Sequence, residues 1–212
     1  MGSAPINEIN NQSDDSEELN RLQSGGAEAA AHIFEEQRER LQRFVMHRMD
    51  VRLQGRLDLE DVMQEAQMVV IRRHEDYINN PAVPFYVWMR SLTGQVLIDL
   101  HRKHLKLQVR NVNREVSLEN QLPFQSSAHA MRDLLMASGT SPSNVAIREE
   151  QAEALRNTLE QMSDIDREVL VLRHLEQLSN GEVASVLGID KSAATKRYIR
   201  ALKRLGEMMP SE

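Results

Sequence analysis

Side chains that bind phosphate gather near the end of the chain. From Lys191 to Arg204 the sequence holds six Lys or Arg residues and no Asp or Glu, although the whole chain has a formal net charge of −6. A local cationic patch attracts the phosphate backbone of nucleic acid whatever the charge of the whole protein. The residues predicted to make this contact are Lys191, Ser192, Thr195, Lys196, Arg197, Arg200 and Lys203.

A helix-turn-helix pattern positions this patch. Ser179 followed by Glu182 has the spacing of a capping box, which starts a helix, and Gly188 suits the positive φ that ends it. Asp190 can cap a second helix, on which the basic residues lie opposite an apolar stripe. The predicted stripe is Ala194, Tyr198, Ala201, Leu202 and Leu205. This arrangement fits the major groove of duplex DNA, with a solvated helical hairpin as the alternative.

A second cationic stretch has different neighbours. From His101 to Arg114 there are five Lys or Arg residues and no acid, and the stretch follows aromatic residues and an amide-bearing loop. Unpaired bases stack on aromatic rings, and a loop pocket can receive a flipped base, so we expect contact with melted DNA. The assigned residues are Asn79, Asn80, Phe85, Trp88, Arg102, Lys103 and Lys106. The alternative is that Phe85 and Trp88 are core residues.

A third surface lies on one face of an expected helix that begins after Asp58. Its residues are Asp61, Gln64, Glu65 and Met68, whose spacing places them in a single stripe. An exposed Met among acids is typical of an adaptable protein-docking surface, whereas the alternative is an ordinary solvated face.

The residues that enzymes and metal sites require are poorly represented. The chain contains no Cys, which excludes thiol nucleophiles, disulfides and thiolate metal ligands. His101 and His104 have no third ligand nearby in sequence, and their cationic neighbours repel metal ions. No Gly-rich phosphate loop and no hydrolase signature is present. We therefore expect neither enzymatic activity nor a cofactor nor a metal site.

Composition and periodicity predict an all-α fold with two small helical domains. Residues 1–27 are expected to form a disordered acidic tail, which either solubilises the protein or inhibits it by mimicking nucleic acid. Residues 28–114 form the first domain, 115–145 a flexible linker, and 146–212 the helix-turn-helix domain. No stretch approaches the roughly 20 apolar residues of a membrane span, so we expect no membrane insertion and a cytoplasmic location.

Within these domains the periodicity indicates individual helices. We expect one helix over 28–49, another after Asp58, a loop over 77–84, and a third helix with Pro84 in its first turn. In the second domain a helix should end near Met162, and Ser163 should begin the next.

The order of these parts resembles a bacterial RNA polymerase sigma factor of the two-domain, extracytoplasmic-function (ECF) type. The segment 59–66 (LEDVMQEA) is similar to region 2.2 of that family. The segments 85–90 (FYVWMR) and 97–103 (LIDLHRK) resemble regions 2.3 and 2.4, and 166–205 resembles region 4. The resemblance covers about residues 28–114 and 146–208, which are most of the chain outside the tail and the linker.

The resemblance implies partners and roles. The stripe around Asp61 would dock on the β′ clamp helices of core RNA polymerase, and the β flap would be a further contact. The loop from Asn79 to Pro84 would capture a flipped base of the −10 element, with Arg102, Lys103 and Lys106 on the backbone. The basic helix would read the −35 element in promoter DNA. Many members of the family are also held by an anti-sigma factor.

We therefore expect a non-enzymatic specificity subunit that binds core polymerase, recognises the −10 and −35 elements and directs transcription initiation. The first alternative is a stand-alone helix-turn-helix regulator that binds duplex DNA as a dimer. The second is a helical adaptor that binds proteins through the Asp61 stripe and never contacts DNA.

Overall fold

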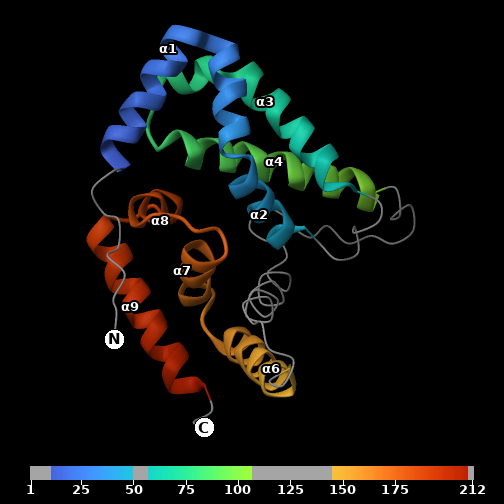
Figure 1. Ribbon diagram of the computed structural model, residues 1–212, viewed down its shortest axis with the longest axis vertical. Coiled ribbons are helices and arrows are strands. Elements are labelled where there is room, and N and C mark those ends of the chain that lie inside the picture. The colour runs from blue at the N-terminus through green and yellow to red at the C-terminus, as the bar shows by residue number, and fades with distance from the viewer. Residues whose placement is uncertain (1–10, 50–56, 107–144, 210–212) are drawn as a thin grey trace.

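The computed structural model describes residues 11–49, 57–106 and 145–209, and most of these residues are helical (Figure 1). The all-α prediction is confirmed. The helices are α1 (Asn11–Glu36), α2 (Arg38–Arg48), α3 (Leu59–Asn79), α4 (Phe85–Lys106), α6 (Val145–Gln161), α7 (Asp164–His174), α8 (Asn180–Leu187) and α9 (Lys191–Met208). No described helix has the length and apolar character that crossing a membrane requires.

Helices α1 to α4 pack around large apolar side chains that water does not reach. All four helices contribute to this core. Phe34 comes from α1, Phe44 from α2, Met63 from α3, and Phe85 and Leu97 from α4. These side chains are fully or almost fully buried. Burying side chains of this size is the main favourable contribution to the folding of such a bundle.

Local signals place the ends of α3 and α4. Asp58 caps α3, as predicted, because its carboxylate accepts a hydrogen bond from the backbone N–H of Glu60. Helix α3 continues to Asn79, so Tyr77 to Asn79 are helical where we expected a loop. The buried Tyr77 ring explains the difference, because it gives the last turn an apolar contact that holds the helix together. Pro84 precedes the first residue of α4.

The first helix differs from the predicted disordered tail. Residues 11–27 belong to α1, which bends at Gly26 (φ 53°, ψ −131°) so that its two arms lie beside each other (Figure 1). Leu22 is fully buried, and Arg21 pairs with Glu36 of the second arm at 2.7 Å. The prediction weighed the acidic composition and overlooked that Leu19 and Leu22 share one helical face. Residues 1–10 lie outside the described part.

The predicted single helix over 28–49 is also interrupted. Helix α1 ends at Glu36, Gln37 is a turn residue, and α2 begins at Arg38. The expected linker, 115–145, lies outside the described residues except for Val145, where α6 begins.

Helices α8 and α9 form the predicted helix-turn-helix, α7 packs against both of them, and each expected cap is present. Ser163 accepts a hydrogen bond from the backbone N–H of Asp166, and Ser179 and Glu182 form a complete capping box. Gly188 adopts the left-handed conformation (φ 62°) that ends α8. Asp190 then caps α9 with a bond of 2.7 Å from the backbone N–H of Ala193.

The buried stripe of α9 is narrower than predicted. Ala194 and Ala201 are fully buried, and Tyr198 and Leu205 are partly buried. Leu202 is 38 % exposed, so its predicted place in the core is wrong. The residue after Ala201 is turned about 100° from it around the helix axis, away from α7 and α8.

Candidate nucleic-acid interface

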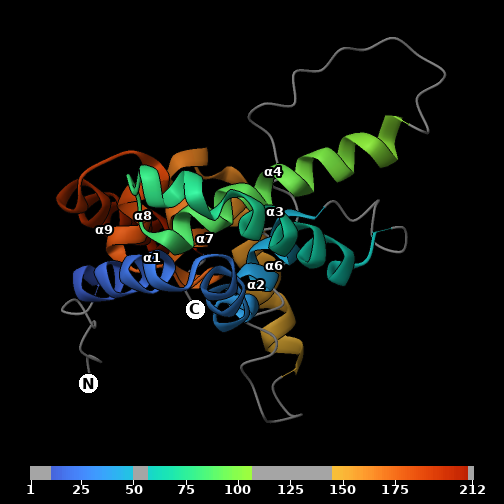
Figure 2. The ribbon, with the colours of Figure 1, turned by 90° about the horizontal axis from the view of Figure 1, so that it is seen from above.

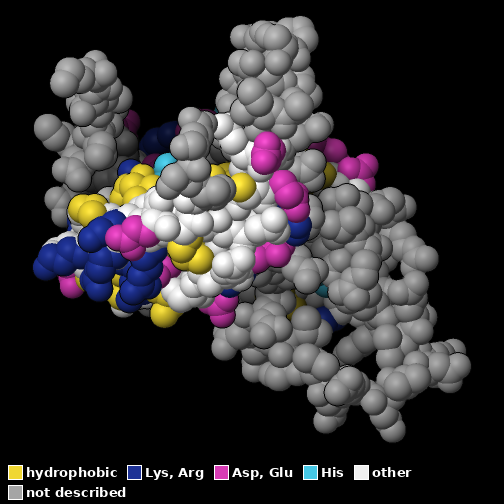
Figure 3. All heavy atoms as spheres, turned by 90° about the horizontal axis from the view of Figure 1, so that it is seen from below, with side chains coloured by type: hydrophobic (Ala, Val, Ile, Leu, Met, Phe, Trp, Pro, Cys, Tyr) yellow, Lys and Arg dark blue, Asp and Glu magenta, His cyan; other side chains and the backbone are white. Residues whose placement is uncertain are grey.

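The basic helix α9 presents most of its predicted contact residues to solvent. Lys191, Ser192, Lys196, Arg200 and Lys203 are exposed, whereas Thr195 and Arg197 are partly buried. Figure 3 shows Lys and Arg side chains gathered on the side of the molecule where α9 lies. The described part therefore carries a cationic face that can meet phosphate groups without rearrangement of α9.

Thr195 is engaged within the helix-turn-helix. Its hydroxyl donates to the backbone carbonyl of Lys191 at 3.0 Å and accepts from the side-chain amide of Asn180, also at 3.0 Å. The Asn180 amide additionally donates to the carbonyl of Lys191 at 3.0 Å. These bonds fix α9 relative to α8. Thr195 therefore helps to hold α9 in place, in addition to lying on the predicted contact side of that helix. Sequence reasoning missed Asn180, because the first residue of a helix carries no signal for such a contact.

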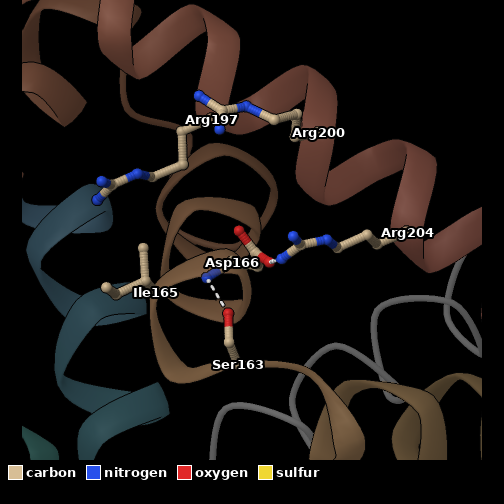
Figure 4. A pocket seen from close by; sticks show the side chains of 6 residues that line it. All are labelled: Ser163, Ile165, Asp166, Arg197, Arg200 and Arg204. Carbon is tan, nitrogen blue, oxygen red and sulfur yellow. Dashed lines mark hydrogen bonds and ion pairs between the residues drawn. The ribbon is translucent and has the colours of Figure 1, made fainter.

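A pocket of about 230 Å³ lies between α7 and α9, and three arginines line it (Figure 4). Arg204 pairs with the buried carboxylate of Asp166, which attaches α9 to the start of α7. Arg197 and Arg200 point away from that carboxylate in Figure 4. Their guanidinium groups give the pocket a cationic rim on which an anionic oxygen can be held.

Three aromatic rings form a cluster where α3 meets α4. The rings of Phe85 and Trp88 stack with centroids 5.4 Å apart, and Tyr77 lies 4.8 Å from Phe85 and 5.4 Å from Trp88. Phe85 is fully buried, whereas Trp88 is partly exposed. The placement of Phe85 contradicts a direct contact with a base and fits the alternative core interpretation. Its ring supports Trp88, which offers an accessible edge of the cluster.

The loop before α4 is held by the same cluster. The Tyr77 hydroxyl donates a hydrogen bond to the carbonyl of Val83 at 3.0 Å, and burial raises the pKa of that hydroxyl well above its usual range. Nearby Asp15 and Glu18 raise this pKa further. The side chains of Asn79 and Asn80 are exposed. The end of α3 and the loop thus present two exposed amides close to an aromatic platform, the combination that unpaired bases recognise.

The cations predicted for this region lie toward the end of α4, which projects away from the other helices (Figure 2). Lys103 is exposed, and Arg102 is partly buried and 4.0 Å from Asp99. Helix α4 ends at Lys106. His101 is buried and is not part of the cationic surface.

The predicted docking stripe is intact on α3. Asp61, Gln64, Glu65 and Met68 are all exposed, and Met68 is 55 % exposed. The opposite face of the helix carries the buried side chains Val62, Met63, Ala66 and Val70. Because the core holds α3 by that face, the acidic stripe is presented on a fixed support.

The family model and the two known proteins described below are all sigma factors or parts of them. The family model described as "Sigma-70, region 4" matches residues 152–205, which include α7, α8 and most of α9. The RNA polymerase sigma-H factor of Pseudomonas aeruginosa is 25 % identical over 153 residues, which are 72 % of this chain and 73 % of that protein. The ECF RNA polymerase sigma factor BldN of Streptomyces coelicolor is 20 % identical over 194 residues, which are 92 % of this chain and 65 % of that protein.

Proposed function

We propose a role for each part of this chain in directing transcription initiation. The chain belongs to the ECF type of RNA polymerase sigma factors. Sigma factors of this family are non-catalytic transcription factors that bind core RNA polymerase and promoter DNA. In our proposal residues 28–114 act at the −10 element and on polymerase, residues 146–212 act at the −35 element, and 115–145 connect them.

Helix α9 enters the major groove of the −35 element. The observation that carries this assignment is the exposed row of Lys196, Arg200 and Lys203, which lies opposite the buried Ala194 and Ala201, with Lys191 also exposed at the start of the helix. Lysines and arginines on such a row bind phosphate and the acceptor edges of guanine. Ser192, near the start of α9, is also placed for a groove contact.

The cluster of Tyr77, Phe85 and Trp88 serves the −10 element. Trp88 provides the stacking surface for an unpaired base, and Asn79 and Asn80 offer amide donors and acceptors to a flipped one. Arg102, Lys103 and Lys106 hold the backbone of the melted strand. Melting then comes from trapping unpaired bases and needs no nucleotide hydrolysis.

Polymerase binds at two places in this proposal. The stripe of Asp61, Gln64, Glu65 and Met68 docks on the β′ clamp helices. The β flap binds the second half of the chain, where Ile199 is 58 % exposed and Leu202 38 % exposed on α9. Neighbouring apolar side chains exposed in this way are typical of protein contacts.

An anti-sigma factor is a further proposed partner, and the cytoplasm, with association to the nucleoid during activity, is the proposed location. The stand-alone regulator is not favoured, because both relatives named above are sigma factors and the similarity to them covers 72 % and 92 % of this chain.

The test is the affinity of the purified full chain for core RNA polymerase without DNA. We expect tight one-to-one binding, lost in the double variant Asp61→Lys, Glu65→Lys. The matched control is Glu75→Lys with Asp76→Lys, which reverses two exposed acids further along the same helix. Undiminished affinity in the first variant would overturn the docking assignment, and no binding by the unaltered chain would overturn the proposed function.

A further inference from the structure

Three hydrogen bonds join the first residue of α8 to the start of α9. The side-chain nitrogen of Asn180 donates to the backbone carbonyl of Lys191 and to the hydroxyl of Thr195, in both cases at 3.0 Å. The Thr195 hydroxyl donates in turn to the same carbonyl of Lys191, also at 3.0 Å. Asn180, Thr195 and the Lys191 carbonyl therefore form a closed triangle of hydrogen bonds across the turn of the helix-turn-helix.

This triangle uses the only proton of the Thr195 hydroxyl. A hydroxyl has one proton to donate and two lone pairs that accept. The proton goes to the Lys191 carbonyl, and one lone pair accepts from Asn180. The amide nitrogen of Asn180 likewise directs one proton to each of its two acceptors. While the triangle holds, Thr195 can offer DNA its γ-methyl group and one lone pair, but no proton.

Thr195 lies on the part of α9 that enters the groove in the proposed function. It follows Lys191 by four residues and Ser192 by three, so the three side chains share one face of the helix. Lys191 and Ser192 are exposed, and Thr195 is partly exposed. In a helix-turn-helix, residues near the start of the second helix are the ones that contact base edges. Thr195 is therefore placed to meet a base.

The bases differ in what they present in the major groove. Guanine presents two acceptors there, which require a donor, whereas thymine is the base that presents a methyl group. A side chain without an available proton cannot bond to the guanine acceptors. Two methyl groups that meet exclude water from both, which is favourable. The chemistry that the triangle leaves to Thr195 therefore matches thymine and does not match guanine.

We infer that Thr195 is a specificity-determining residue that contacts the methyl group of a thymine in the −35 element, and that Asn180 is the positioning residue that holds it in this role. The inference rests on the proposed function, in which α9 enters the major groove of that element. Asn180 acts through the Thr195 hydroxyl and has no contact with the base in this inference.

Asn180 matters because it restrains the rotation of the Thr195 side chain. Turning the hydroxyl toward DNA breaks two hydrogen bonds while Asn180 is present, but only one when Asn180 is absent. The net contribution of one hydrogen bond corresponds to about a fivefold change in an equilibrium. We therefore expect Asn180 to disfavour guanine at the base that Thr195 contacts by about this factor.

The first test isolates the thymine methyl group. Holoenzyme reconstituted from the full chain and core RNA polymerase selects duplexes from a pool with randomised −35 and −10 segments. We expect one position of the selected −35 segment to be enriched in thymine because of Thr195. Replacing that thymine by deoxyuridine, which lacks only the methyl group, should weaken binding by about fourfold.

Two variants of Thr195 assign this effect to its own methyl group. Thr195→Ser keeps the hydroxyl and removes the methyl group, so it should bind the thymine and deoxyuridine duplexes equally. Thr195→Val keeps a methyl group and removes the hydroxyl, so the preference for thymine should remain. Both changes are close in size to threonine, and circular dichroism of each variant checks that the helices are retained.

A double-mutant cycle tests the role of Asn180. Asn180→Ala should lower the preference for thymine over guanine by about fivefold in the chain that has Thr195. It should leave the preference unchanged in the Thr195→Val chain, which has no hydroxyl to release. A residue that only stabilised the fold would change the affinity for all duplexes alike. The matched control is Asn157→Ala, which removes an exposed amide that bonds to Arg156 inside α6.

The outcomes separate this inference from the proposed function. Equal binding of thymine and deoxyuridine duplexes by the unaltered holoenzyme, or a methyl effect that persists in Thr195→Ser, would overturn the contact made by Thr195. Enrichment of adenine or cytosine at the position that Thr195→Ser alters would show that the remaining lone pair faces the base, which also overturns it. Failure of the holoenzyme to select any −35 sequence would overturn the proposed role of α9 and, with it, this inference.

Discussion

The hydroxyl of Tyr77 donates a hydrogen bond to the backbone carbonyl of Val83, and the ring of the same residue touches Trp88. One side chain at the end of α3 thus holds the loop before α4 and the aromatic platform in a common arrangement. This coupling makes the loop and the platform one unit, and it can be tested without changing any residue that faces DNA.

Replacing Tyr77 by Phe should keep the core and release the loop. The hydrogen bond is partly buried, so its loss should cost about 1 kcal/mol in the free energy of ordering the loop. We expect open-complex formation at a promoter to weaken by about fivefold, measured as the equilibrium fraction of promoter opened by the holoenzyme. An unchanged open fraction, with unchanged −35 affinity, would show that the loop does not need this anchor.

Trp88 should carry most of the stacking on the unpaired base. Trp88→Ala should reduce the reactivity of unpaired thymines in the −10 region toward permanganate, because base stacking on an aromatic ring contributes about 1–3 kcal/mol. Trp88→Phe should keep part of the reactivity. A Trp88→Ala protein that opens DNA as well as the unaltered protein would remove this residue from the −10 contact.

The salt dependence of −35 binding should report the cations of α9. Lys196→Ala and Arg200→Ala should each weaken duplex binding and reduce the slope of log K against log salt by about one. Arg156→Ala is the matched control, because Arg156 pairs with Glu153 and Glu160 inside α6. Slopes that stay the same in both α9 variants would mean that these residues do not touch phosphate.

The capping box of α8 should stabilise the helix-turn-helix. Ser179→Ala removes the acceptor for the backbone N–H of Glu182 and should lower the free energy of unfolding by about 1 kcal/mol. Ser91→Ala, at an exposed position in α4, makes the same chemical change without a cap. Denaturant unfolding curves that shift equally in the two variants would contradict the capping role.

Stability should fall as the pH rises through neutrality because of Glu18. Burial first, then repulsion by Asp15 and Glu182, raises the pKa of this carboxyl to about 7. The folded protein therefore binds the proton more tightly than the unfolded chain. The stabilisation is complete below about pH 4.5, the unfolded pKa, and is lost as the pH rises through 7.

Glu18→Gln separates this effect from other titrations. At pH 8 the variant should be more stable than the unaltered protein by about 1–3 kcal/mol, whereas at pH 5 the difference should be small. Glu17→Gln, an exposed neighbour, is the control. Parallel stability curves for the unaltered protein and Glu18→Gln from pH 5 to 8 would refute the shift.

The sequence alone determined the features that depend on neighbours within one turn of helix. Asp58, Ser163, Ser179 and Asp190 were all predicted as caps, and Gly188 as a helix end, because a cap bonds a backbone group two or three residues away. The acidic stripe on α3 and the basic row on α9 followed from helical spacing in the same way.

Only the tertiary structure decided which of these side chains are buried and what the distant ones meet. Phe85 and Trp88 are three residues apart and equally aromatic, yet packing buries one and leaves the other accessible. The first arm of α1 is helical because Leu22 finds a core to enter. Arg48 and Arg90 meet Glu176 across 128 and 86 residues. No local pattern encodes such a pairing, because its energy depends on how the whole chain excludes water from one carboxylate.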